Sequence, residues 1–351
     1  MDFKTDIITH KLNSQEMNWT DLSKSRRVEL LKLLENRTGL NAKSIEKDWW
    51  VTLALKALFS GSYASHLVFK GGTSLSKCWH LIDRFSEDID LAIDREFLGF
   101  AGDLTKREIG KKLRKASCTL IRGEMREEIE KFIIDSGIDK EQFTLDVNIT
   151  AESNVDPETL FLHYESVLDN SDYIFNTVKI EIGSRSLMEP SEGVIIKSII
   201  GELLPTADFA DTDFVVHAVL PKRTLLEKAF LLHELFQSGT IGKDINRMSR
   251  HLYDLERLMD SKYCEDILGD NILYNEIIKH REQFTSMAGV DYSTHQPQTI
   301  CFIPPDSALK DWEKDYLLMQ ENMIYGESLS FKSLIERIRE LNERFKTVSF
   351  L

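Results

Sequence analysis

Two short motifs in the first third of the chain carry residue types that suit phosphate and metal chemistry. They are Gly71-Gly72-Thr73-Ser74 and Asp88-Ile89-Asp90. Glycines have no Cβ atom, so the backbone of the first motif can approach a phosphate closely. A helix after it would direct unpaired N–H groups at the anion. Thr73 and Ser74 would add hydroxyl donors, and Lys77 would add a positive charge. The first motif therefore predicts a phosphate-binding loop.

The two aspartates of the second motif are expected to share one face of a strand. Side chains alternate along a strand, so Asp88 and Asp90 would lie roughly 7 Å apart, with Ile89 pointing the other way into a core. Two such carboxylates repel each other unless a cation lies between them. Hard oxygen ligands at this spacing suit Mg²⁺, with Mn²⁺ as an alternative, held together with substrate phosphates. Metal ions bound in this way activate a hydroxyl and stabilise a leaving pyrophosphate.

Each motif alone has a plainer explanation. A Gly-Gly turn can join any strand to a helix, and two aspartates can belong to a solvated edge strand. Here about fifteen residues and one short helix separate the two motifs, and this proximity favours the chemical interpretation.

The elements that would position these residues follow from hydrophobic periodicity. In the first part of the chain we expect helices over residues 15–60, 74–82, 104–137 and 191–204, and strands over 66–70, 88–93, 143–150, 177–183 and 214–219. From Arg223 onward the pattern is helical, with helices expected over 223–237, 244–260, 271–286, 307–322 and 328–346. The prediction is an α+β fold in two domains, a nucleotide-site domain over residues 1–205 with the sheet and N-terminal helices and a helical C-terminal domain over residues 206–351.

Composition limits the class of protein. The net charge of −14 argues against a non-specific nucleic-acid coat protein. Residues 106–126 nevertheless form a basic cluster, which is either a solvated helix face or a surface for a polyanion. No apolar run is long enough for a membrane span, no secretory signal is evident, and the four cysteines form no CxxC pair. We therefore expect a cytoplasmic protein with reduced thiols and no membrane partner.

The segments Phe69–Lys77 and Arg84–Leu91 together closely resemble the AbiEii/AbiGii toxin family of the DNA polymerase β-like nucleotidyltransferase superfamily. The superfamily pattern is an apolar residue, Gly, Gly or Ser, a spacer, and then Asp-x-Asp or Asp-x-Glu. Here the spacer is slightly longer and Lys70 replaces the apolar residue, two traits that AbiEii-like members share. The resemblance is strong over residues 40–95 and moderate over 175–260. It implies a polymerase β-like core, a small mixed sheet with flanking helices, followed by a helical domain.

The superfamily also has a third acidic residue on a neighbouring strand. Glu181 in Thr177–Ile182 and Asp146 in Leu145–Asn148 are both candidates. We favour Glu181, because its strand is more clearly amphipathic. Such a residue would bind a metal ion or act as general base towards the attacking hydroxyl.

AbiEii-like members carry a lysine on one helix and an Arg-x-x-x-Asp-Leu signature on the next. The matching residues here are Lys228 and the segment Arg250–Leu255, which contains Asp254. The lysine would neutralise charge on the leaving group, and Asp254 would orient that lysine or bind the second substrate. The plainer alternative is a salt bridge that only docks the two domains.

The resemblance implies transfer of a nucleoside monophosphate from an NTP to an acceptor hydroxyl, in a bacterial toxin–antitoxin or phage-defence (abortive infection) system. Relatives are associated with nucleotide addition to the 3′ end of tRNA. The expected partner is a cognate antitoxin with a winged-helix DNA-binding part. The alternatives are nucleotidylation of a small molecule or protein, and an inactive nucleotide-binding regulatory module.

Overall fold

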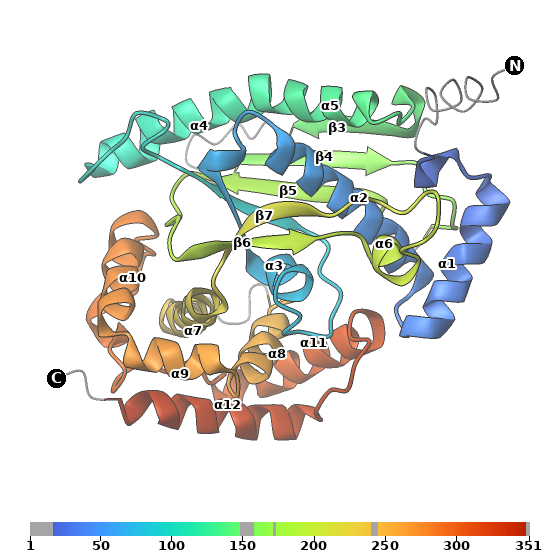
Figure 1. The fold of residues 1–351 in the computed structure, drawn as a ribbon. Helices are drawn as coiled ribbons and strands as arrows, with labels where there is room; N and C mark the ends of the chain where they lie inside the picture. The colour runs from blue at the N-terminus through green and yellow to red at the C-terminus, as the bar shows by residue number, and fades with distance from the viewer. Residues whose placement is uncertain (1–16, 148–157, 171–172, 240–244, 349–351) are drawn as a thin grey trace, which may run out of the picture.

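A computed structural model describes residues 17–147, 158–170, 173–239 and 245–348 of the chain. Its centre is a seven-stranded mixed sheet with the strand order β3-β4-β5-β2-β1-β7-β6. The strands are β1 (Leu67–Lys70), β2 (Ile89–Ile93), β3 (Phe143–Val147), β4 (Glu158–Tyr164), β5 (Thr177–Gly183), β6 (Ser191–Ile196) and β7 (Phe214–Val219). Helices flank this sheet, and a separate group of helices lies below it in Figure 1. The predicted α+β fold class is therefore confirmed.

Strands β1, β2 and β5 form the middle of the sheet. β2 runs antiparallel to β1 and parallel to β5. Phe69 on β1 is the register partner of Leu91 on β2, and both are buried in the main core. Because side chains alternate along a strand, the polar residues next to them face the other side of the sheet. The central strands therefore present a polar face at the carboxyl end of β1.

The N-terminal helix α2 (Ala42–Ser60) lies on the opposite face, where the apolar side chains point, and crosses in front of the sheet in Figure 1. The preceding helix, α1 (Lys24–Thr38), packs against α2. The side chain of Asn41 caps α2, since its Oδ1 accepts a hydrogen bond from Lys43 N at 2.8 Å. Trp50 of α2 stacks on Tyr164 of β4 at a centroid distance of 5.1 Å. α2 is consequently buried along most of its length.

The predicted helical stretch over 104–137 is confirmed, but it is not a uniform α-helix. It consists of a π-helical segment η3 (Glu108–Leu113), α4 (Arg114–Leu120), a second π-helical segment η4 (Ile121–Met125) and α5 (Arg126–Asp135). Its buried side chains include Ile109, Leu113, Ile121 and Ile129. Most of its basic side chains remain on the surface.

The helix predicted over residues 191–204 is wrong. Residues 191–196 form β6, which pairs antiparallel with β7 from Ser191↔Val219 to Ile196↔Phe214. Only a short helix, α6 (Ile199–Leu203), follows it. The β-branched run Val194–Ile196 favours a strand once a neighbouring strand offers hydrogen bonds. The strand predicted over 214–219 is confirmed as β7.

Two elements were not expected from the sequence. β4 pairs antiparallel with both β3 and β5, and α9 (Lys262–Gly269) follows a one-turn break after α8 (Ser249–Leu258). The strand expected over 143–150 is present as far as Val147, and residues 148–150 lie outside the described residues.

The C-terminal helices enclose a second hydrophobic core. Besides α8 and α9 they are α7 (Pro221–Gln237), α10 (Asn271–Phe284), α11 (Leu309–Asn322) and α12 (Phe331–Lys346). Short 3-10 turns lie at Trp19–Asp21, Ala64–His66, Lys140–Gln142, Tyr292–His295 and Asp306–Ala308. No helix in the described part of the chain is long and apolar enough to span a membrane.

The boundary expected at residue 205 needs correction. Residue 205 lies between β6 and β7, which pair with each other, so a boundary there would cut the sheet. The change to an all-helical chain comes at Pro221, where α7 begins. The second core also reaches back into the sheet-bearing part, because Leu75 of α3 (Gly71–Lys77) packs in it.

Candidate active site

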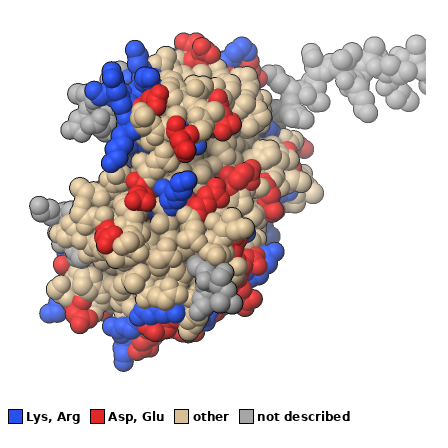
Figure 2. All heavy atoms as spheres, turned by 90° about the vertical axis from the view of Figure 1, so that its left-hand side faces the viewer, with Lys and Arg blue, Asp and Glu red and all other residues tan. Residues whose placement is uncertain are grey.

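A cavity of about 390 Å³ lies between the central strands and helices α7 and α8. The sheet side of its lining comprises Lys70, Gly71, Gly72, Arg84, Ser86, Asp88, Asp90 and Glu181, and the helical side comprises Thr224, Glu227, Lys228, Leu231, Met248, Arg250, His251 and Arg281. Figure 2 shows the molecule from the left-hand side of Figure 1, with acidic and basic side chains along the indentation between its upper and lower parts. The fold therefore brings both sequence motifs and the distal lysine to one cavity.

Three carboxylates line the sheet side of this cavity. Asp90 and Glu181 are register partners on the parallel strands β2 and β5, and Asp88 immediately precedes β2. Each of the three side chains is half-buried and lines the cavity. Asp146 lies on β3 at the end of the sheet, two strands away from β5, and its side chain is 66% exposed. Of the two candidates, only Glu181 is placed beside the aspartates.

The electrostatics of this cluster are those of crowded carboxylates. Burial, reinforced by the neighbouring carboxylates of Glu87 and Asp90, raises the pKa of Asp88 to about 6. The Glu181 carboxylate has a cation within reach, since Lys179 Nζ lies 2.9 Å from its Oε1. A bound cation would therefore be most favourable beside Asp88 and Asp90.

The donor set fits a hard divalent cation in its chemistry. Oxygen ligands are what Mg²⁺ prefers, and one or two carboxylates with substrate phosphates are enough to hold it. Among the described residues no three Asp, Glu, His or Cys side chains are gathered closely enough to hold a metal ion by themselves. Asp88 and Asp90 would thus be the protein ligands, with Glu181 next to them.

The glycine loop is shaped by the aspartate that it faces. Gly71 has a φ of +79°, which side chains rarely tolerate, and a Cβ atom there would clash with the Asp90 carboxylate. A Cβ atom at Gly72 would lie 2.6 Å from Arg84 Nη2. Both positions therefore need glycine, and the backbone of the loop is open towards the cavity.

The other residues predicted for phosphate binding point elsewhere. Thr73 Oγ1 donates to the backbone oxygen of Asp88 at 2.5 Å, and Ser74 is buried. Lys77 Nζ lies 2.6 Å from Asp48 Oδ1, and both side chains are largely buried. None of the three lines the cavity. The expectation that these side chains reach a phosphate there is corrected, because the helical turn directs them into the protein interior.

Lys228 and Asp254 belong to a buried ionic triad whose third member is Arg84. Asp254 accepts two hydrogen bonds from Arg84, Nε to Oδ1 and Nη2 to Oδ2, both at 2.7 Å. Lys228 Nζ lies 2.8 Å from Asp254 Oδ2. The side chain of Asp254 is fully buried, and that of Lys228 is 9% exposed. Asp254 therefore positions Lys228 at the cavity wall and cannot itself contact a second substrate.

The pKa values in the triad follow from burial and charge. Burial alone would raise the pKa of Asp254, but Arg84 and Lys228 outweigh it and hold that pKa well below its usual range. Burial lowers the pKa of Lys228, and Asp254 opposes this change. Arg84 directly precedes the segment that contains the aspartates, but nothing in the sequence indicated its partner.

A second buried network supports the residue next to Asp88. Glu87 Oε2 lies 2.7 Å from Lys47 Nζ of α2, and Glu87 Oε1 lies 2.5 Å from Arg247 Nη1. The guanidinium of Arg247 also lies over the ring of Tyr173, 4.9 Å from its centroid. Glu87 thus forms one ion pair with the N-terminal helix α2 and another with Arg247, which lies just before α8. Sequence reasoning missed this network, because its members are far apart along the chain.

Three basic residues, Lys228, Arg250 and Arg281, line the helical side of the cavity together with Glu227, and Lys70 adds a cation from the end of β1. Glu234 partly neutralises Arg281, whose Nε lies 2.7 Å from Glu234 Oε1. Burial lowers the pKa of His251 well below its ordinary value, so this imidazole is neutral at neutral pH. The carboxylates on the sheet side of the cavity therefore face the cations of Lys228, Arg250 and Arg281 on its helical side, here called the cationic wall. This arrangement suits a metal-bound polyphosphate.

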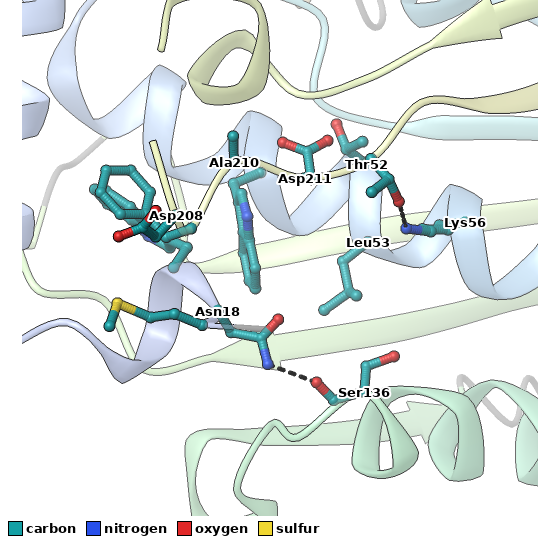
Figure 3. A pocket seen from close by; sticks show the side chains of 13 residues that line it. Asn18, Thr52, Leu53, Lys56, Ser136, Asp208, Ala210 and Asp211 are labelled. Atoms are coloured by element: carbon teal, nitrogen blue, oxygen red, sulfur yellow. Dashed lines mark hydrogen bonds between the residues drawn. The ribbon is translucent and has the colours of Figure 1, made fainter. Parts of the chain in front are cut away.

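Another cavity, of about 220 Å³, lies on a different part of the molecule (Figure 3). Asn18 and Ser136 close one side of it, where Asn18 Nδ2 donates to Ser136 O at 2.7 Å. On another side Lys56 Nζ donates to Thr212 Oγ1 at 2.6 Å. None of the predicted site residues lines this cavity.

A sequence model of the family described as nucleotidyl transferase AbiEii toxin, type IV toxin–antitoxin system, matches residues 53–341. This range contains the glycine loop, the three carboxylates and the triad. The chain belongs to the AbiEii nucleotidyltransferase toxin family. The family predicted from the motifs is confirmed. A comparison with curated proteins finds no match.

Two solved structures are similar to this AbiEii-family chain. One is MenT4, a nucleotidyltransferase toxin from Mycobacterium tuberculosis H37Rv, with 17% identity and a TM-score of 0.42, covering 94% of this chain and 100% of its own. The other is JHP933 from Helicobacter pylori, with 12% identity and a TM-score of 0.42, covering 88% of this chain and 93% of its own. We assign no residue role from either likeness.

Proposed function

We propose that this chain transfers the nucleoside monophosphate of an NTP to the 3′-terminal hydroxyl of tRNA in the cytoplasm, with Mg²⁺ or Mn²⁺ as cofactor. One observation carries the proposal. Asp90 and Glu181 are register partners that share a cavity with Asp88 and the glycine loop, and a cationic wall faces them. The family supplies the reaction class, and the tRNA acceptor is the part that the experiment below must test.

In the proposed reaction the acceptor oxygen attacks the α-phosphorus of the NTP. A bond forms between them, the bond from the α-phosphorus to the bridging oxygen breaks, and pyrophosphate leaves. Asp88 and Asp90 would hold the metal ion, which activates the hydroxyl and neutralises phosphate charge when bound. Glu181, beside Asp90, would accept the proton of the attacking hydroxyl.

The cationic wall would act on the leaving group. The ammonium of Lys228, fixed by Asp254, lines the cavity opposite the carboxylates. It would stabilise the negative charge that grows on the departing pyrophosphate. Arg250 and Lys70 line the same cavity and would bind the remaining phosphate oxygens. Asp254 is a positioning residue, because it reaches the cavity only through Lys228.

The experiment incubates the protein with total RNA, Mg²⁺ and each α-labelled NTP in turn, and compares the wild type with Asp88→Ala. We expect label in the tRNA fraction, a loss of at least about a hundredfold in the variant, and a loss in EDTA that Mg²⁺ restores. Asp146→Asn is the matched control, since this exposed carboxylate lies outside the cavity. Equal labelling by wild type and Asp88→Ala would refute the site, and label in protein or in a small molecule would replace the acceptor.

As a member of a type IV toxin–antitoxin family, the chain is proposed to have a cognate antitoxin with a winged-helix DNA-binding part. We expect production of the wild-type chain to arrest growth, and co-production of the antitoxin to relieve the arrest. The Asp88→Ala variant should not arrest growth. Arrest by the variant would show that toxicity does not depend on this site.

A further inference from the structure

The basic cluster between residues 106 and 126 is not used by the site described so far. It holds eight basic and two acidic side chains in a chain whose net charge is −14. Four of the basic residues are exposed and have no ion-pair partner among the described residues. They are Lys106, Arg107, Lys111 and Lys115. They lie at the beginning of the long helical segment, on and next to the π-helical turns of η3.

This pattern differs from an ordinary solvated helix face in the same protein. On α12 three basic residues, Arg337, Arg344 and Lys346, each pair with a glutamate three or four residues away. Such pairs stabilise an exposed helix, whereas like charges at this spacing destabilise it by a few tenths of a kcal/mol per pair. In the 106–115 segment Ile109 and Leu113 are buried underneath, so the cations cannot turn away from solvent. The segment therefore concentrates positive charge that is compensated within residues 106–115 only by Glu108, whose Oε1 lies 3.5 Å from Lys112 Nζ.

The segment begins at the rim of the active-site cleft. Asp90, Glu181 and Arg281 also line an extension of about 330 Å³, which ends at Phe284 and Thr285 of the α10 region. Next to Phe284, the side chain of Gln283 donates to the backbone oxygen of Leu104 at 3.2 Å.

A further cation lies at the end of the extension. The guanidinium carbon of Arg95 lies 5.0 Å from the centroid of the Phe284 ring, at the end of the extension. In Figure 2 basic side chains gather on the same face as the indentation that holds the cleft. Two of the three carboxylates thus line one extension together with Phe284, which contacts Arg95. Leu104, which Gln283 contacts, lies two residues before the 106–115 segment.

We propose that the 106–115 segment binds the sugar–phosphate backbone of the acceptor RNA, whose 3′ end reaches the carboxylates through this extension. The inference rests on the proposed function and adds where the acceptor lies. An acidic protein repels RNA at long range, so a local cluster must supply the attraction. Contacts to phosphates position a nucleic acid without reading its sequence. The segment would therefore set affinity and orientation, while the cavity performs the reaction.

The test compares two double variants of the full-length protein. Lys111→Glu/Lys115→Glu alters the segment, and Lys32→Glu/Arg37→Glu alters exposed, unpaired cations of α1 by the same net charge. α1 lies at the opposite side of the molecule from the beginning of the segment in Figure 1. Binding of a tRNA transcript is measured by fluorescence anisotropy at several salt concentrations. Transfer is measured to tRNA and to a trinucleotide acceptor, which lacks the rest of the RNA backbone.

We expect the segment variant to bind tRNA at least about tenfold more weakly, and the control variant to bind like wild type. The slope of log affinity against log salt concentration should become shallower by the equivalent of about 1.5 to 2 phosphate contacts. Transfer to the trinucleotide by the segment variant should be unchanged. Equal weakening in both variants, or in neither, would overturn the segment as the RNA surface. Loss of antitoxin response with unchanged RNA binding would assign the segment to a protein partner instead.

If the glutamates prevent folding, Lys111→Gln/Lys115→Gln gives the same comparison. Absence of transfer by the wild type to any acceptor would refute the proposed function, whereas binding would still report on the segment.

Discussion

Asp254→Asn is the substitution that most directly tests how the site is held together. The wild-type carboxylate is fully buried and contacts two cations, Arg84 through two hydrogen bonds of 2.7 Å and Lys228 at 2.8 Å. The substitution preserves shape but removes the charge between the two cations. Both would then lie close together in a region that excludes water.

The size of the effect follows from this geometry. Removing one partner of a buried ion pair costs about 3–5 kcal/mol, because an uncompensated charge stays buried. We expect the free energy of unfolding of Asp254→Asn to fall by this amount, out of a typical total of about 5–15 kcal/mol. Lys228→Met should cost much less stability, since Arg84 and Asp254 remain as a neutral hydrogen-bonded pair. The same Lys228→Met substitution should nevertheless abolish most nucleotide transfer, because the cavity loses its ammonium.

The measurements are chemical denaturation of wild type, Asp254→Asn, Lys228→Met and the double variant, together with nucleotide transfer by each. In the double variant only Arg84 is left uncompensated, so Asp254→Asn should cost less there than in the wild type. The difference is the coupling energy of the two residues. Equal stability of wild type and Asp254→Asn, or equal destabilisation by both single substitutions, would refute the buried triad as the element that positions Lys228.

The remaining predictions concern the carboxylates, the loop and the pH dependence of stability. Glu181→Gln should reduce nucleotide transfer strongly while Asp146→Asn leaves it near wild type; the reverse order in a labelled-NTP assay would make Asp146 the third carboxylate. Gly71→Ala should cost about 1 kcal/mol or more of stability, because of the positive φ, and displace the Asp90 carboxylate, so transfer should fall further than thermal stability alone explains. Burial would raise the pKa of Glu227, but Arg223, Lys70 and Arg281 hold it at about 2, below its ordinary value of 4.5. Because the folded-state pKa is lowered, the ionised Glu227 carboxylate stabilises the fold fully above about pH 4.5, and this contribution is lost as the pH falls towards 2. Glu227→Gln should therefore flatten the acid branch of the curve of unfolding free energy against pH. An unchanged acid branch would contradict the interpretation.

The errors in the sequence-based prediction have physical causes. Residues 191–196 contain enough apolar residues for a buried helix, but β7 offers them a strand partner that local periodicity does not show. Thr73 and Lys77 have the right chemistry for phosphate binding, but α3 begins at Gly71, and its helical turn directs both side chains inward. In both cases local propensity was compatible with two outcomes, and contacts distant in sequence decided between them.

The sequence by itself determined the chemistry at the sheet. Glycine without a Cβ atom, two aspartates two residues apart, and their short separation are local properties, so they identified the family and predicted the central residues without coordinates. Only the tertiary structure showed which of the two candidate carboxylates lies beside the aspartates, because the register of β2 with β5 pairs Asp90 with Glu181 and leaves Asp146 at the far end of the sheet. It also revealed Arg84 as the partner of Asp254, since a buried charge must be balanced by whichever opposite charge the folded chain brings next to it.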